Sequence, residues 1–184
     1  MMDVVVDPVV QMTLRAALAL LLASAAVHKL RDLTRFREVL GAYEILPRAM
    51  VSGAAVAVPA LEATLAAAIA SGVSSAAAGG SACVLMLAYA AAIFVNLRRG
   101  RSGIDCGCMG PGSRVPLGPG LVVRNLLLAA TALLLVVPSS GRALLWLDLA
   151  GVAAATSALS ACWLAGERML ALAPRVAELR RRMS

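Results

Sequence analysis

The sequence predicts an all-α fold, a multi-pass bundle of transmembrane helices. Of the 184 residues, 61% are hydrophobic, and the mean hydropathy is +0.86; a soluble domain is about 45–50% apolar. Apolar runs of about 20 residues, the length that crosses a bilayer, recur along the chain. The net charge is +7, but the basic residues gather between these runs and aromatic residues make up 3%. With few rings to stack on bases, we do not expect nucleic-acid binding.

The first expected span is residues 9–30, an almost unbroken run of Leu, Ala and Val. Residues 1–8 lack the basic region and cleavage site of a signal peptide, so we expect this run to be retained. Residues 31–46 are polar overall and are expected to form an amphipathic helix in the membrane interface. Their apolar residues recur at helical spacing: Leu33, Phe36, Val39 and Leu40.

Two further spans follow, residues 49–71 and 76–97. Pro47 precedes the first of them and can end one helix and open the next. Both spans are rich in alanine, which favours close packing of helices in lipid. The polar segment after them, residues 98–118, is expected to be a loop because it is rich in Gly, Arg and Pro.

The last expected spans are residues 119–137 and 142–165. Five spans are therefore the prediction, and four remain the alternative if the last segment lies in the interface. Residues 166–184 form a basic, helical tail that ends in three arginines. The whole chain is expected to be a single membrane domain.

The loop at 98–118 contains the sequence Asp105-Cys106-Gly107-Cys108. A disulfide between cysteines this close closes a small, strained ring, and strained disulfides tend to be catalytic or labile. Cys106 and Cys108 are therefore candidate redox residues. Two alternatives stay open: ordinary loop thiols, or a Cu(I) or Zn site formed with His28.

Because successive spans alternate in direction, several reactive groups are expected at one end of the bundle. His28 and Lys29 end the first span, Arg124 lies about 8 Å into the fourth, and Cys162 is near the exit of the fifth. Positive groups near a thiol favour the thiolate, the nucleophilic form. The alternatives are that His28 and Lys29 are an interfacial anchor and that Cys162 is a small core residue.

A second polar cluster is expected at the opposite end of the bundle. Arg15, Glu62 and Asp148 each lie about 8–10 Å from that face when depth is counted along the helices. Charges at this depth usually pair. We therefore expect Arg15 to pair with Glu62 or Asp148, most simply as a structural salt bridge.

The distribution of basic residues predicts the orientation in a bacterial cytoplasmic membrane. Of the 17 Lys and Arg residues, fourteen fall at the end that carries the Cys-Gly-Cys loop and the C-terminal tail. Arg142 is at the other end, while Arg15 and Arg124 lie inside spans. By the positive-inside rule, the basic loops are expected to face the cytoplasm.

A set of motifs in spans one to four resembles the MauE family of methylamine-utilisation membrane proteins, within the wider MauE/DoxX group. The motifs are His28-Lys29, Phe36, Tyr43, Leu46-Pro47, Asp105-Cys106-Gly107-Cys108 and Arg124-Asn125. The resemblance implies a four-helix core similar to vitamin K epoxide reductases, with a fifth helix added. It implies that Cys106 and Cys108 are a redox pair, and that His28, Lys29 and Arg124 line the pocket or favour the thiolate.

The same resemblance implies a role in disulfide formation or maturation of an exported enzyme such as methylamine dehydrogenase. A thioredoxin-like protein would be the partner, and a quinone is a candidate electron acceptor. Asp105 and Asn125 would be supporting residues within the matched motifs. The alternatives are a non-enzymatic scaffold for a redox partner and the Cu or Zn protein described above.

Overall fold

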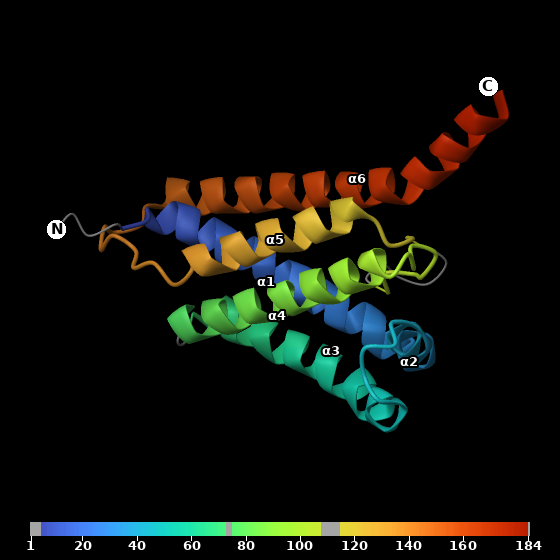
Figure 1. Ribbon diagram of the computed structural model, residues 1–184. Coiled ribbons are helices and arrows are strands. Elements are labelled where there is room, and N and C mark those ends of the chain that lie inside the picture. The colour runs from blue at the N-terminus through green and yellow to red at the C-terminus, as the bar shows by residue number, and fades with distance from the viewer. Residues whose placement is uncertain (1–4, 73–74, 108–114, 184) are drawn as a thin grey trace.

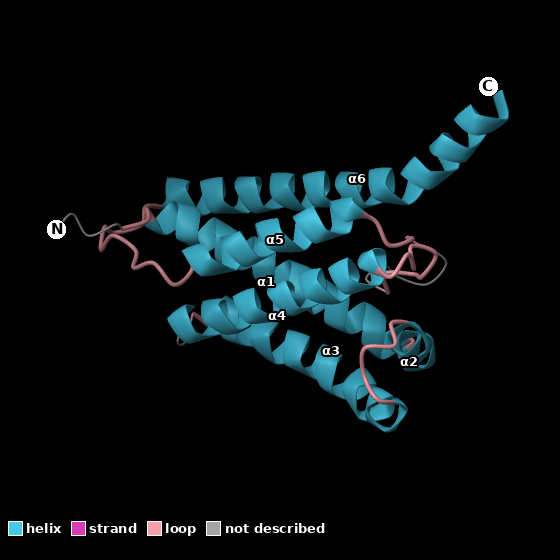
Figure 2. Ribbon diagram, in the orientation of Figure 1, coloured by secondary structure: helices cyan, strands magenta, loops and turns pink. Residues whose placement is uncertain are grey.

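The computed structural model describes residues 5–72, 75–107 and 115–183, which form six helices joined by loops (Figures 1 and 2). The helices are α1 (Pro8–Arg31), α2 (Leu33–Ala42), α3 (Arg48–Ser71), α4 (Ser75–Arg98), α5 (Pro119–Leu134) and α6 (Trp146–Met183). Among these, α1, α3, α4 and the first part of α6 are long and apolar enough to cross a bilayer. The predicted all-α, multi-pass membrane bundle is therefore confirmed.

The bundle is built from two close helix pairs. α1 packs against α3, α4 packs against α5, and α6 lies along α1 on one side of the bundle (Figure 1). The short helix α2 lies at the end where α1 exits. Leu18, Leu22, Ile69, Ala82 and Ala132 are in the central core, each at most 2% exposed. Large apolar side chains on the outer surface, such as Leu127 and Val84, are exposed, as expected for a lipid-facing surface.

Helix boundaries follow from local capping. Pro8 occupies the first turn of α1, where its missing N–H costs nothing, and the Asp7 side chain accepts a hydrogen bond from Val9 N at 2.8 Å. Asp32 ends α1 and caps α2, because its side chain accepts from Arg35 N at 3.0 Å. The chain therefore turns at Asp32 from the first span into an amphipathic helix.

The C-terminal half differs from the expected segments. α5 has 16 residues and ends at Leu134, so it rises about 24 Å, less than the hydrocarbon core of about 30 Å. Pro138 follows it in the sequence, which disfavours continuation of the helix. α6 begins at Trp146 and continues through the expected tail, whose Ala, Leu, Glu and Arg residues are strong helix formers. Its C-terminal part extends beyond the bundle (Figure 1).

Candidate functional site

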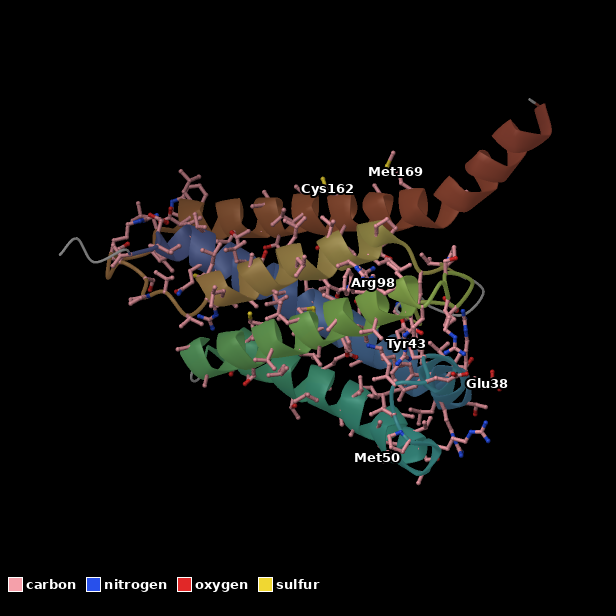
Figure 3. The ribbon with its side chains drawn as sticks, in the orientation of Figure 1. Glu38, Tyr43, Met50, Arg98, Cys162 and Met169 are labelled. Atoms are coloured by element: carbon pink, nitrogen blue, oxygen red, sulfur yellow. The ribbon has the colours of Figure 1, made fainter. Side chains whose placement is uncertain are left out.

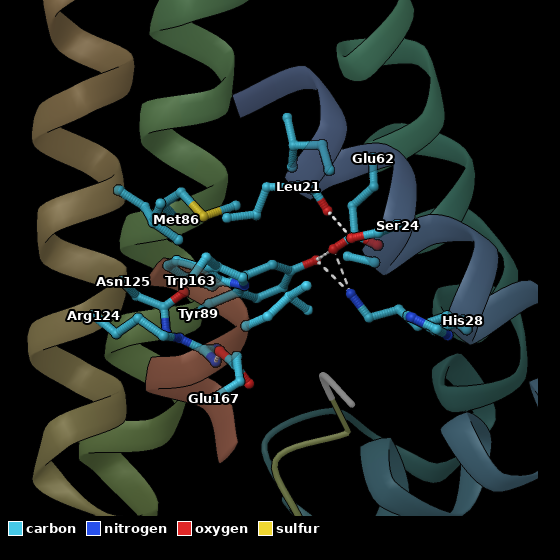
Figure 4. A pocket seen from close by; sticks show the side chains of 15 residues that line it. Leu21, Ser24, His28, Glu62, Met86, Tyr89, Arg124, Asn125, Trp163 and Glu167 are labelled. Carbon is cyan, nitrogen blue, oxygen red and sulfur yellow. Dashed lines mark hydrogen bonds and ion pairs between the residues drawn. The ribbon is translucent and has the colours of Figure 1, made fainter. Parts of the chain in front are cut away.

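A polar cavity of about 170 Å³ lies inside the bundle and is lined by residues of α1, α3, α4, α5 and α6 (Figure 4). Its polar and charged lining residues are Ser24, His28, Lys29, Glu62, Tyr89, Arg124, Asn125 and Glu167. Three residues that the sequence predicted at one end of the bundle thus meet in one cavity, His28, Lys29 and Arg124, and Asn125 of the Arg124-Asn125 motif lines it with them. Charged groups inside a membrane protein are costly and usually functional, so this cavity is the candidate site.

Lys29 and Glu62 form a buried ion pair in this cavity. The side chains are 5% and 1% exposed, and Lys29 Nζ bonds to Glu62 Oε1. The Tyr89 hydroxyl donates to the same carboxylate oxygen at 2.7 Å and lies 3.5 Å from Lys29 Nζ. The ammonium also lies over the rings of Phe36 and Tyr89, 5.4 and 5.0 Å from their centroids. Lys29 is therefore not an interfacial anchor, because its charge points into the protein.

The partner predicted for Glu62 was wrong, and side-chain direction is the reason. Helical side chains lean toward the N-terminus of their own helix. α1 and α3 are consecutive spans of opposite direction, so Lys29 leans toward the membrane centre while Glu62 leans toward the Lys29 end. Depth counted along the backbone ignores both displacements, and it placed Glu62 with Arg15 instead.

Arg124 connects the cavity to the cysteine loop. Its Nη1 forms an ion pair with Glu167 Oε1, and its Nη2 lies 3.9 Å from Cys106 Sγ. The guanidinium also stacks over the Trp163 ring, 5.4 Å from the centroid. Trp163 and Glu167 are four residues apart on α6 and therefore share one helix face. One cation thus contacts a carboxylate, an aromatic ring and a thiol at the same time.

The segment before Cys106 is held in place by Asp105. Its Oδ2 accepts from Arg35 Nη2 of α2 at 2.7 Å, and its Oδ1 accepts from the backbone of Gly107 and Val115 at 3.4 and 3.2 Å. Cys106 N donates to Val115 O at 2.9 Å. Asp105 is therefore a structural residue of the loop, which it ties to α2 and to the segment that leads into α5.

Gly107 can occupy its position because it has no side chain. Its φ is +72°, a region that L-residues with a Cβ rarely adopt. A Cβ built there would lie 2.8 Å from Cγ1 of Val39 and 3.7 Å from the Phe36 ring. The loop therefore packs directly on α2 at the residue between the two cysteines.

Cys106 itself is buried, with 7% of its surface exposed, in a second apolar cluster. The cluster contains Val39, Tyr43, Ile93, Val115, Leu117 and Leu121. Cys108 lies outside the described residues, so the predicted Cys106–Cys108 pair stays a prediction. Within the part of the chain that the structure describes, no three His, Cys, Asp or Glu side chains gather as a metal site would require. The alternative of Cys106, Cys108 and His28 includes the undescribed residue and also stays a prediction.

Arg15 and Asp148, the other members of the predicted polar cluster, lie apart from Glu62. Arg15 Nε donates to the carbonyl of Ile69 at 3.1 Å, at the C-terminal end of α3, where a cation is favoured by the helix dipole. Asp148 pairs with Arg142 at 2.8 Å, and Arg142 also pairs with Asp7 at 3.0 Å. The prediction that Arg15 pairs with Glu62 or Asp148 was therefore wrong.

Cys162 does not lie beside Cys106, where the sequence had predicted it. It lies on the outer side of α6 and points away from the bundle, as does Met169 (Figure 3). Cys83 packs against the central core. Among the cavity residues that the sequence did not identify are Tyr89, Trp163 and Glu167. The i, i+4 spacing of Trp163 and Glu167 is the signal that identifies a common face toward Arg124.

Comparison with known proteins places these features in a family. The family described as methylamine utilisation protein MauE matches residues 7–138, which include α1 to α5 and the Cys-Gly-Cys sequence. Methylamine utilization protein MauE of Paracoccus denitrificans is 38% identical over 133 residues, covering 72% of each chain. The MauE protein of Methylorubrum extorquens is 37% identical over 145 residues, covering 76% of this chain and 78% of the relative.

MauE of Methylophilus methylotrophus is 38% identical over 134 residues, covering 72% of this chain and 70% of the relative. No solved structure matches the chain. The matched region carries every predicted site residue except Asp148 and Cys162, and it leaves Trp163 and Glu167 outside. On this similarity, the chain belongs to the MauE family of methylamine utilisation proteins.

Proposed function

We propose that this protein is a membrane thiol–disulfide redox protein that acts in methylamine utilisation. The observation that supports the proposal best is the position of Arg124, whose guanidinium lies 3.9 Å from Cys106 Sγ. A cation beside a thiol favours the thiolate, which is the form that attacks disulfides. Asp105 and Gly107 hold the reactive segment against α2.

The proposed reaction is exchange between Cys106, Cys108 and a thioredoxin-like partner. A thiolate of the partner attacks the Cys106–Cys108 disulfide and forms a mixed disulfide, releasing one cysteine as a thiolate. The partner's second thiolate then attacks the mixed disulfide and releases the other cysteine. The partner's dithiol becomes a disulfide, and two electrons pass to this protein. The final client would be an exported enzyme similar to methylamine dehydrogenase.

Thiol labelling in inverted membrane vesicles and in intact bacteria tests this proposal. In inverted vesicles, where the face predicted to be cytoplasmic is accessible, a membrane-impermeant maleimide should label Cys106 and Cys108 after reduction and leave them unlabelled before it. Labelling in intact cells versus inverted membrane vesicles reports the side, which the charge distribution predicts to be cytoplasmic. Cys106→Ser and Cys108→Ser should each abolish maturation of the client, whereas Cys162→Ser, at the outer side of α6, should not. Full maturation with both single variants would refute the proposal.

A non-enzymatic scaffold is the second candidate, and the burial of Cys106 favours it. A thiol at 7% exposure among six apolar neighbours can serve packing alone. This function predicts that Cys106→Ala and Cys108→Ser retain maturation. Arg35→Ala, which releases the loop from α2, would then remove it.

A further inference from the structure

A second, apolar cavity lies beside the polar one, between α1, α5 and α6. Its volume is about 430 Å³. The two cavities share five lining residues: Leu21, Ser24, Leu128, Trp163 and Leu164. The apolar cavity is bordered by Leu20 and Leu164, which are 56% and 62% exposed on the outer surface of the bundle. The two cavities are therefore adjacent: the first has charged side chains in its lining, and the second has a lining of mostly apolar residues and borders the lipid.

The polar cavity contains hydrogen-bonding atoms that lack partners. Oε2 of Glu62 and Nδ1 of His28 are buried and make no hydrogen bond with any residue the structure describes. Both residues line the polar cavity. In a membrane interior, an unsatisfied buried polar atom is costly and calls for a partner that is not part of the helices. A carboxylate oxygen accepts hydrogen bonds, so that partner must donate one.

The charges of the polar cavity indicate that the head group of the ligand is neutral. Lys29 is paired with Glu62, and Arg124 with Glu167, so these four side chains sum to zero charge. A charged head would leave a net charge in a region of low dielectric, which is strongly unfavourable. A hydroxyl group is neutral, donates to a carboxylate and can pair with either tautomer of His28.

We propose that the two cavities together bind a neutral, membrane-soluble molecule that has a hydroxyl-bearing head and an apolar tail. The head lies beside Glu62 and His28, and the tail lies between α1, α5 and α6. The ligand enters from the bilayer past Leu20 and Leu164. This inference goes beyond the thiol exchange and does not depend on it.

Quenching of Trp163 fluorescence tests the site, because Trp163 lines both cavities. The other tryptophan, Trp146, is 78% exposed in the first turn of α6. A Trp146→Phe variant in phosphatidylcholine nanodiscs is titrated with dodecanol brominated at its terminal carbon, and with the matching bromododecane. The alcohol should quench Trp163 at about tenfold lower concentration, as expected for one hydrogen bond to a charged group. A Trp163→Phe variant reports partition alone, so both probes should quench Trp146 equally.

Two variants separate the head site from the tail site. Lys29→Met combined with Glu62→Leu keeps the cavity neutral and should abolish the preference for the alcohol. Ser160→Phe fills the apolar cavity without touching the ion pair, and it should raise the concentration required for both probes. Helicity measured by circular dichroism shows whether each variant is folded.

The identity of the head follows from a third probe, a phenol with a brominated alkyl chain. Tighter binding of the phenol identifies a ring-bearing lipid, and tighter binding of the alcohol identifies a glycerol-type lipid; either result supports the site. Equal quenching of Trp163 by alcohol and hydrocarbon would overturn it. The proposed site would also be overturned if the alcohol quenched Trp146 better than bromododecane does, or if the variant with Lys29→Met and Glu62→Leu kept the preference for the alcohol. No thiol takes part in the measurement, so its failure leaves the proposed exchange untouched.

Discussion

The guanidinium of Arg124 contacts both a carboxylate and a thiol. Its contact with the carboxylate determines how strongly its positive charge stabilises the thiolate. Glu167 binds one end of the group while Cys106 lies at the other. Both ionic side chains are about nine-tenths buried, so solvent screens them little. The negative charge of Glu167 should therefore weaken the stabilisation of the Cys106 thiolate by Arg124.

Substitutions at these two positions should change the reactivity of Cys106 in opposite directions. We expect Arg124→Met to slow alkylation of reduced Cys106 at neutral pH by about tenfold, because the thiolate loses its nearby cation. Glu167→Gln should accelerate it. The rate is measured against pH with iodoacetamide, using mass spectrometry of the peptide that contains Cys106. Arg124→Lys is the control that keeps the charge, and unchanged pH profiles in both variants would contradict the prediction.

Gly107 and Gly100 form a natural comparison, since both have a φ of +72°. A Cβ at Gly107 would collide with Val39, whereas a Cβ at Gly100 has no atom within 4 Å. Gly100→Ala should cost about 1–2 kcal/mol from the backbone alone, and Gly107→Ala should cost more. Thermal unfolding in detergent measures both. Adding Val39→Ala to Gly107→Ala should recover part of the loss, and no recovery would show that the contact with Val39 is unimportant.

At the scale of elements, one polar clamp joins the start of α1 to the start of α6. Arg142 bonds to Asp7, which precedes α1, and to Asp148 in the first turn of α6. The hydrogen bond from Arg142, followed by that from Val9 N, holds the pKa of Asp7 below its ordinary value of 3.8. The backbone adds to the clamp, because Val6 N donates to Pro138 O at 3.0 Å and Ser140 N donates to Val6 O at 2.9 Å.

This clamp should make the stability of the protein depend on acidity. Because the folded pKa of Asp7 is lowered, its contribution is complete above the ordinary pKa and is lost as pH falls through the lowered one. As the pH falls below 3.8, the ordinary pKa of Asp7, we expect the melting temperature of the wild type to fall more steeply than that of Asp7→Asn. Asparagine still caps α1, so the comparison isolates the charge. Parallel curves would show that Asp7 contributes nothing through its ionisation.

The extents of α1, α3 and α4 were predictable from the sequence, whereas the ends of α5 and α6 and the directions of individual side chains were not. Apolar length identifies α1, α3 and α4 within one or two residues, because each is bounded by polar or helix-breaking residues. α5 ends at Leu134, before Pro138. α6 includes the basic C-terminal segment, because charged residues do not prevent a helix from forming. Hydropathy identifies the length of an apolar segment, but it gives little information on where a helix ends outside the membrane.

At the scale of the whole molecule, the Lys29–Glu62 pair is the most buried of the ion pairs formed by the described residues. Lys29→Met should destabilise the protein by about 3–5 kcal/mol, because it leaves the Glu62 carboxylate buried without its cation. Lys29→Met combined with Glu62→Met should recover most of this loss, since neither charge remains. Unfolding of the purified protein in detergent measures both variants. If the double variant is as unstable as the sum of the single variants, the two residues are not coupled.

The sequence predicted which end of the bundle carries the candidate site, but not the partners of Glu62 and Glu167. Alternating helix direction brings His28, Lys29 and Arg124 to one end, because that argument needs only backbone topology. Glu62 was misplaced because its pairing depends on which way two long side chains lean. Glu167 was counted with the basic tail, since its partner becomes visible only when α6 is seen packed beside α5.

The helix that supplies Trp163 and Glu167 begins after the family match ends at residue 138. The cavity is thus lined by two parts of the chain. The lining residues of α1, α3, α4 and α5 lie in the region that the family model matches, and those of α6 lie outside it. Exchanging residues 146–183 between homologues would therefore replace the lining residues of α6 and leave the Lys29–Glu62 ion pair unchanged. Chimeras of this kind would transplant one protein's ligand preference onto another, making α6 the natural place for specificity to diverge.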